Sequence, residues 1–68
     1  MSRRFVYQDE KSNKFWEIEV YGDSFGVCFG RIGTEGQSSF KSFDSEAECQ
    51  QEAQKLIASK IRKGYVEK

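Results

Sequence analysis

The chain contains no histidine, only two cysteines and no net charge, and each of these shortages excludes a class of function. Without histidine, the usual acid–base dyads and metal-ligand spacings are missing. Two cysteines, Cys28 and Cys49, are too few for a disulfide framework or a thiolate metal site. We expect two reduced thiols, Cys28 turned inward behind a sheet and Cys49 under a helix. A bridge between them is the less favoured alternative.

Charge and hydropathy limit the possible partners. Eleven lysines and arginines balance eleven acids, so the chain as a whole does not attract phosphates, and nucleic-acid binding would require a local basic patch. The apolar runs are too short to span a membrane, and the segment Met1–Arg4 is not an apolar signal segment. We therefore expect a cytoplasmic protein, most simply a bacterial one, with no membrane partner.

Aromatic side chains are abundant, with six Phe, three Tyr and one Trp among 68 residues. Large rings remove much apolar surface from water, which makes a core feasible in so short a chain. We expect residues 1–68 to form one stand-alone domain that is monomeric.

Hydrophobic alternation predicts strands in the first half of the chain. Over residues 14–21, one face carries Trp16, Ile18 and Val20, and the other, expected to be solvated, carries Phe15, Glu17, Glu19 and Tyr21. Over residues 25–32, one face carries Phe25, Val27, Phe29 and Arg31, and the other carries Gly26, Cys28, Gly30 and Ile32. The glycines predict a close approach by the helix or a neighbouring backbone. Further strands are expected at 37–43 and, at the sheet edge, at 4–8, with turns at 22–23 and 33–36.

A helical period begins after Asp44. Ser45 and Glu48 have the spacing of a capping box, and Gly64 stands where a helix ends in a left-handed residue. Between them, one stripe at helical spacing is formed by Cys49, Ala53, Leu56, Ile57, Lys60 and Ile61. Tyr65 and Val66 can then return to the sheet edge as a short strand. Together these patterns predict an α+β fold, a small antiparallel sheet of four to five strands with one α-helix packed across it.

The expected helix begins with acids and ends with bases. The helix macrodipole explains this distribution, because it favours anions at the N-terminus and cations at the C-terminus. A functional alternative makes Lys60, Arg62 and Lys63 a secondary basic patch that faces phosphate.

No catalytic constellation is visible. The serines have no histidine to activate them, and the glycines at 30, 33 and 36 open a hairpin rather than a helix and lack the lysine of a P-loop. We predict a protein that is not an enzyme and has no cofactor, no metal and no small-molecule substrate.

Phe29 and Arg31 are two apart on a strand and therefore project from the same face. On a solvated face, the ring could stack on a sugar or base while the guanidinium binds a phosphate. Alternatively, Phe29 is a core residue and Arg31 extends along it to solvent; spacing alone favours this interpretation. A third alternative buries Phe29 and pairs Arg31 with Glu17 or Glu19.

Several blocks of the chain resemble the WGR domain, which is named for a Trp-Gly-Arg triplet that is Phe-Gly-Arg here. The central block is Phe29-Gly30-Arg31-Ile32-Gly33-Thr34 with Gly36-Gln37. Asn13-Lys14-Phe15-Trp16 resembles the opening strand of the family, and Ser45-Glu46-Ala47 with Lys60 and Lys63-Gly64-Tyr65 looks like the helix and closing segment. The resemblance covers nearly the whole chain and implies a small antiparallel sheet with one helix across it.

In eukaryotic poly(ADP-ribose) polymerases the WGR domain binds DNA break ends and relays that event to a catalytic domain. The resemblance implies that Phe29 packs on a terminal nucleotide, Arg31 contacts DNA or a neighbouring domain, and Asn13 and Lys14 lie near the 5′ phosphate. We therefore predict a non-catalytic module that binds DNA or other nucleic acid and prefers duplex ends or 5′ phosphates. The predicted binding residues are Asn13, Lys14, Phe29, Gly30 and Arg31. The alternative is a protein-interaction module that docks an acidic or helical partner in trans on the same face.

Overall fold

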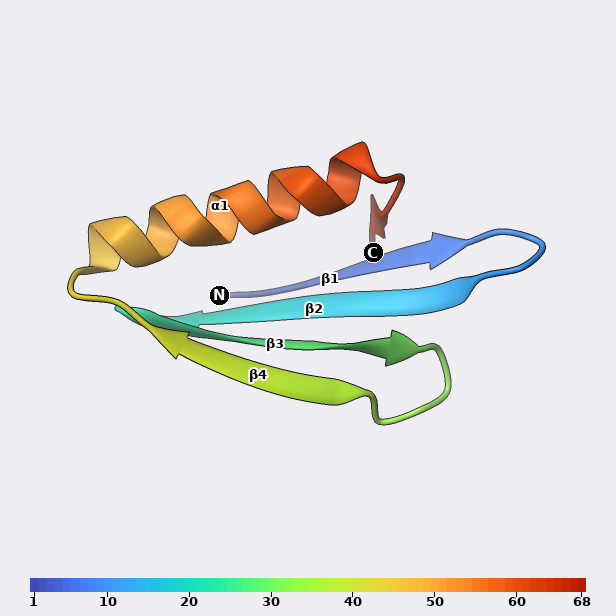
Figure 1. The fold of residues 1–68 in the computed structure, drawn as a ribbon, viewed down its shortest axis with the longest axis horizontal. Helices are drawn as coiled ribbons and strands as arrows, with labels where there is room; N and C mark the ends of the chain where they lie inside the picture. Colours follow the sequence, from blue (N-terminus) through green and yellow to red (C-terminus); the bar gives the residue numbers. More distant parts are fainter.

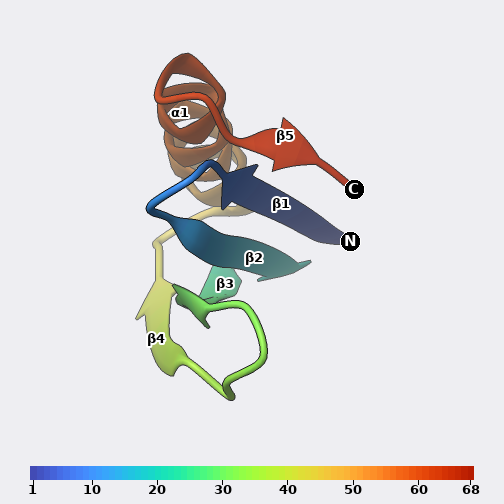
Figure 2. The same cartoon turned by 90° about the vertical axis from the view of Figure 1, so that its right-hand side faces the viewer.

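The computed structural model describes residues 1–68 and contains a five-stranded antiparallel sheet with one helix packed across it (Figure 1). In chain order the elements are β1 (Ser2–Gln8), β2 (Asn13–Tyr21), β3 (Ser24–Arg31), β4 (Gln37–Ser42), α1 (Glu46–Arg62) and β5 (Val66–Glu67). The strand order across the sheet is β4-β3-β2-β1-β5 (Figure 2). The predicted α+β fold is confirmed.

The position of β1 differs from the prediction. The segment that we expected at the sheet edge is an inner strand, because β5 pairs with it through Phe5↔Glu67 and Val6↔Val66. The bidentate contact between Arg3 and Glu67, with an Nη2–Oε1 distance of 2.7 Å, holds β5 in place.

The main core lies between the sheet and α1. On the helix-facing side, cross-strand pairing brings together Phe5 and Trp16, and then Val20 and Phe25. The helix covers them with Cys49, Ala53 and Ile57, all of which are buried. The predicted stripe therefore faces the sheet from Cys49 to Ile57, and Cys49 lies under the helix as expected. Ile61, at the end of that stripe, is 53% exposed.

Both ends of α1 are stabilised by local hydrogen bonds. The Ser45 hydroxyl accepts the Glu48 N–H at 3.2 Å, which is the serine half of the predicted capping box. At the other end Gly64 has φ +104°, and the N–H groups of Gly64 and Tyr65 donate to the carbonyls of Ile61 and Lys60, both at 3.0 Å. This pair of bonds is a Schellman motif, which reverses the chain and returns Tyr65 toward the sheet.

A second, smaller apolar cluster lies on the outer face of the sheet, opposite the helix. We expected Phe15 to be solvated, but only 4% of it is exposed. It pairs with Val6 and Gly30, and the 33–36 turn folds back over it. A Cβ at Gly30 would lie 2.9 Å from the Gly36 Cα, and one at Gly36 would lie 2.8 Å from the Phe15 ring. The predicted close backbone approach is thus confirmed at Gly30.

Gly26 and Cys28 also lie on this outer face. The Phe40 ring covers Gly26, so the helix does not approach that glycine. Cys28 is only partly buried and its Sγ donates to the Glu35 carbonyl at 3.4 Å. The prediction that Cys28 turns inward is wrong, because Cys28 pairs with Glu17 on the side of the sheet away from α1. Cys28 and Cys49 are both free thiols.

Candidate nucleic-acid interface

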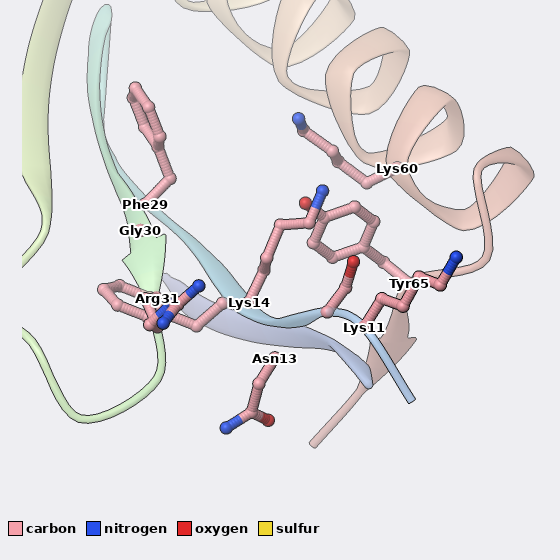
Figure 3. A pocket seen from close by; sticks show the side chains of 10 residues that line it. Lys11, Asn13, Lys14, Phe29, Gly30, Arg31, Lys60 and Tyr65 are labelled. Carbon is pink, nitrogen blue, oxygen red and sulfur yellow. The ribbon is translucent and has the colours of Figure 1, made fainter. Parts of the chain in front are cut away.

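A groove of about 370 Å³ lies between the C-terminal end of α1 and the paired ends of β2 and β3 (Figure 3). We call it the helix-side groove, and its lining residues are Lys11, Ser12, Asn13, Lys14, Phe15, Phe29, Gly30, Arg31, Lys60 and Tyr65. The lining includes four basic side chains and no acid. The groove therefore has the charge and the aromatic content that a phosphate-bearing ligand requires.

Phe29 and Arg31 are both exposed in this groove. Phe29 pairs with the buried Trp16, yet 41% of Phe29 is exposed, so the interpretation that spacing favoured, a core Phe29, is wrong. Trp16 lies under α1, whereas Phe29, its partner on β3, lines the groove.

Arg31 has no carboxylate partner in the structure. Glu17 instead contacts Arg4 at 3.4 Å, and Glu19 lies 3.9 Å from the Met1 amino group. The alternative that pairs Arg31 with Glu17 or Glu19 is therefore also wrong. The Arg31 guanidinium is free to bind an anion.

Lys60 brings a partly buried cation into the groove from the inner stripe of α1. Its Nζ lies 5.6 Å from the Trp16 ring centroid and 5.3 Å from that of Tyr65. Burial lowers the pKa of Lys60 below its usual range, and the nearby charges of Lys63 and Lys14 lower it further. An anion bound beside Lys60 would relieve the repulsion that lowers this pKa.

A second hollow continues the groove toward β1. Lys14, Lys60 and Tyr65 line both, and Tyr7 and Lys63 are added in the second hollow. The Tyr7 and Tyr65 rings are 5.6 Å apart, and the Lys14 Nζ lies 5.6 Å from the Tyr7 ring centroid. Rings and cations therefore alternate along this end of the molecule.

The loop between β1 and β2 is shaped by Asp9. Its carboxylate accepts the N–H groups of Lys11 and Ser12 at 2.8 and 2.6 Å, and these bonds lower the pKa of Asp9. Interaction with the same carboxylate raises the pKa of Tyr7. The Asp9 carboxylate is thus occupied within its own turn. Asp9 and Glu10 line a further hollow, which shares Arg31 with the groove.

The predicted site residues divide between the two faces of the sheet. Lys14, Phe29 and Arg31 come together on the helix-facing side, and Figure 3 shows Asn13 turned away from them. Neighbouring residues on a strand point to opposite faces, and the Asn13 Oδ1 accepts a hydrogen bond from Gln8 Nε2 at 3.0 Å. Gly30 lines the groove with its backbone.

The predicted secondary basic patch is also divided. Lys60 lines both hollows and Lys63 lines the second, whereas Arg62 lines neither. The side chains of Tyr65 and Lys11 were not predicted as part of the site. Gly64 could have predicted the position of Tyr65, because a Schellman motif brings the residue after the glycine back against the last helical turn.

A family model of the WGR domain matches residues 1–68. Two proteins of Escherichia coli K12 are similar to the chain. The uncharacterized protein YfeS is 54% identical over 67 residues, which are 98% of this chain and 28% of YfeS. Protein YehF is 49% identical over 65 residues, which are 96% of this chain and 24% of YehF. The chain thus spans about a quarter of the length of these relatives.

Among solved structures, a structural-genomics crystal structure of a Bacteroides fragilis protein matches with a TM-score of 0.96 and 51% identity, over 100% of this chain and 19% of that one.

The present structure has no helix with the length and apolar composition of a membrane-spanning segment. The WGR domain is a non-catalytic module that binds nucleic acid in poly(ADP-ribose) polymerases. Because the family model covers the chain from Met1 to Lys68, the chain belongs to the WGR domain family.

Proposed function

We propose that this domain binds nucleic acid in the helix-side groove and prefers duplex ends that carry a 5′ phosphate. One observation carries the proposal: the exposed Phe29 ring lines the same groove as Arg31, Lys14 and Lys60, and no acid lines it. Aromatic stacking tolerates any base, and charge-assisted bonds to phosphate supply affinity.

Each groove residue has a distinct part in this proposal. Phe29 stacks on the sugar or base of the terminal nucleotide, because the last base pair of a duplex has one face on which no other pair is stacked. Arg31 and Lys14, directly opposite each other in the β2–β3 pairing, bind phosphate oxygens. Lys60, already partly desolvated and without a counter-ion, adds a third cation against the terminal phosphate.

The neutral net charge is compatible with this proposal because the charges are separated in space. Two of the three acids of α1, Glu46 and Glu48, lie in its first turn, at the opposite end of the helix from Lys60. The third, Glu52, lies 3.7 Å from Lys55. Binding should depend on salt, with log K falling by about 0.9 per neutralised phosphate for each unit of log salt concentration.

The test compares three DNA duplexes of identical sequence at low salt by fluorescence anisotropy. The first is blunt with 5′ phosphates, the second lacks the phosphates, and the third is closed at both ends by hairpin loops. We expect the first to bind most tightly and the closed duplex to bind about tenfold more weakly, as the loss of one stacking or phosphate contact implies.

The outcomes separate the parts of the proposal. Equal binding of all three duplexes would contradict the preference for ends and leave nucleic-acid binding standing. No binding to any of them at low salt would contradict the proposal. The groove would then suit an acidic partner protein, which is the alternative function of the same face.

A further inference from the structure

The outer face of the sheet carries a separate hollow of about 190 Å³ over β3. We call it the outer hollow, and its lining residues are Ser2, Glu17, Ile18, Glu19, Tyr21, Gly26, Val27, Cys28, Ser38 and Phe40. This lining contains two carboxylates and two exposed rings but no lysine or arginine. The outer hollow is therefore opposite in charge to the helix-side groove.

The strand register explains how the outer hollow forms. Gly26 pairs with Glu19 on one side and Phe40 on the other, and the next pair of neighbours places Cys28 beside Glu17. A Cβ at Gly26 would come within 2.6 Å of the Phe40 ring, so glycine allows the ring to lie over the strand. The ring is 76% exposed, so its outward side is free to contact a ligand.

Two arginines of the chain show which side chain a neighbouring ring and carboxylate can bind together. On the same outer face, the Arg4 guanidinium lies 4.9 Å from the Phe15 ring centroid and 3.4 Å from Glu17. On the helix-facing side, Arg3 lies 5.3 Å from the Phe5 ring centroid and 2.7 Å from Glu67. In both places a guanidinium contacts a ring and a carboxylate. In the outer hollow, the Phe40 ring and the Glu19 carboxylate have no guanidinium, because Arg4 lies over Phe15 and contacts Glu17.

We propose that the outer hollow docks an arginine side chain of a partner protein. The guanidinium stacks on Phe40 and binds the carboxylate of Glu19, with Glu17 beside it. A planar guanidinium combines stacking with paired hydrogen bonds, which a lysine ammonium cannot do. The present neighbour of Glu19, the Met1 amino group, is a long contact between half-exposed groups, and such pairs contribute little.

The same observations disfavour nucleic acid as the occupant. Glu17 and Glu19 would repel the phosphates of nucleic acid. A second copy of this chain has Arg31 and Arg62 without carboxylate partners, whereas Arg3 and Arg4 are engaged within their own molecule. A dimer through this face is therefore one of the outcomes that the test distinguishes.

The test uses two short peptides, acetyl-Gly-Arg-Gly-amide and its citrulline analogue, each titrated into the ¹⁵N-labelled domain. Citrulline keeps the size and planarity of arginine and removes its charge. We expect amide shifts at Glu19, Gly26, Cys28 and Phe40 with the arginine peptide, and binding about tenfold weaker with citrulline. Phe40→Ala and Glu19→Gln should each weaken arginine binding, whereas Gln54→Ala, on an exposed position of α1, should not.

Because Phe40 is largely exposed, Phe40→Ala should fold, and unchanged amide shifts of α1 check this. Equal binding of the two peptides, or unchanged binding in folded Phe40→Ala, would overturn the proposal. Concentration-dependent shifts at Phe40 without peptide, together with a dimer in sedimentation, would assign the surface to a second copy and would also overturn it.

Discussion

The two faces of this sheet, built from the same strands, have opposite chemistry. The helix-side groove combines Lys14, Arg31 and Lys60 with an exposed ring and lacks acids, whereas the outer hollow combines Glu17 and Glu19 with exposed rings and lacks a free cation. Alternation along a strand separates neighbouring residues to opposite faces, so a neutral chain can carry two strongly polarised surfaces. Net charge therefore describes neither surface.

The two faces also differ in what protects their apolar residues. On the helix-facing side, α1 covers the core, and Phe29 lies outside that cover. On the outer face there is no helix, and Phe15 is covered by a glycine turn and by Arg4. A phenylalanine on either face can thus be structural or available for binding, depending on what lies over it.

The largest expected effect is on stability, when Phe15 and Phe29 are each replaced by alanine in separate variants. Phe15→Ala should lower the free energy of unfolding by about 3–4 kcal/mol, because a buried ring is removed from a small domain. Phe29→Ala should cost much less, about 1 kcal/mol, because 41% of Phe29 is already exposed to solvent, compared with 4% of Phe15. Urea unfolding of both variants measures the difference, and equal losses would contradict the assignment of the two faces.

The glycine turn over Phe15 gives the next largest effect. Gly36→Ala should cost about 2–3 kcal/mol, because Gly36 has φ +74° and a Cβ there would meet the Phe15 ring and the Phe29 carbonyl oxygen. Gly33→Ala is the matched control, since Gly33 also has positive φ but nothing lies within 4 Å of its Cβ position. It should cost only about 1 kcal/mol from backbone strain. Thermal unfolding that ranked Gly33→Ala as the more damaging change would refute the packing explanation.

Two arginine variants test whether the helix-facing side binds DNA. Arg31→Ala should weaken binding to a 5′-phosphorylated duplex by about 1–3 kcal/mol and reduce the salt dependence, because a charge-assisted phosphate contact is lost. Arg62→Ala, which removes a charge outside the groove, should cost less than about 0.5 kcal/mol. Fluorescence anisotropy measures both, and a similar loss in both variants would indicate generic attraction to the helix end.

The smallest expected effect is a shift in the pH dependence of binding. The pKa of Lys60 is lowered by burial and by Lys63 and Lys14, so Lys60 loses its proton before an ordinary lysine as the pH rises. DNA affinity should therefore begin to fall at a lower pH than it would if Lys60 had the pKa of an ordinary lysine. Lys60→Arg keeps the charge and should move the fall to higher pH. Identical pH profiles for the two proteins would show that Lys60 does not contact the DNA.

Much of the fold could be predicted because its signals are local. Alternation over residues 14–21 and 25–32, the Ser45 cap and Gly64 each act within a few residues. The burial of Phe15 could not be predicted in this way, because it depends on a distant turn folding back onto the strand. Cys28 was placed wrongly because alternation assigns residues to two faces and does not say which of them the helix covers.

The candidate site was predicted in part. The resemblance to the WGR domain pointed to Lys14, Phe29 and Arg31, which the structure brings together. The meeting of Lys60 and Tyr65 with these residues depends on where α1 ends relative to the sheet, which is a long-range property. The separation of Asn13 from Lys14 follows from strand geometry alone and could have been predicted from alternation.

The most direct test of the account is an NMR titration of the ¹⁵N-labelled domain with a short 5′-phosphorylated DNA duplex at low salt. We predict amide shifts clustered at Lys14, Phe29, Arg31 and Lys60 that fade as salt is added, with none at Gly26, Cys28 and Phe40. Shifts centred on the outer face, or no shifts at all, would contradict the assignment of nucleic-acid binding to the helix-side groove.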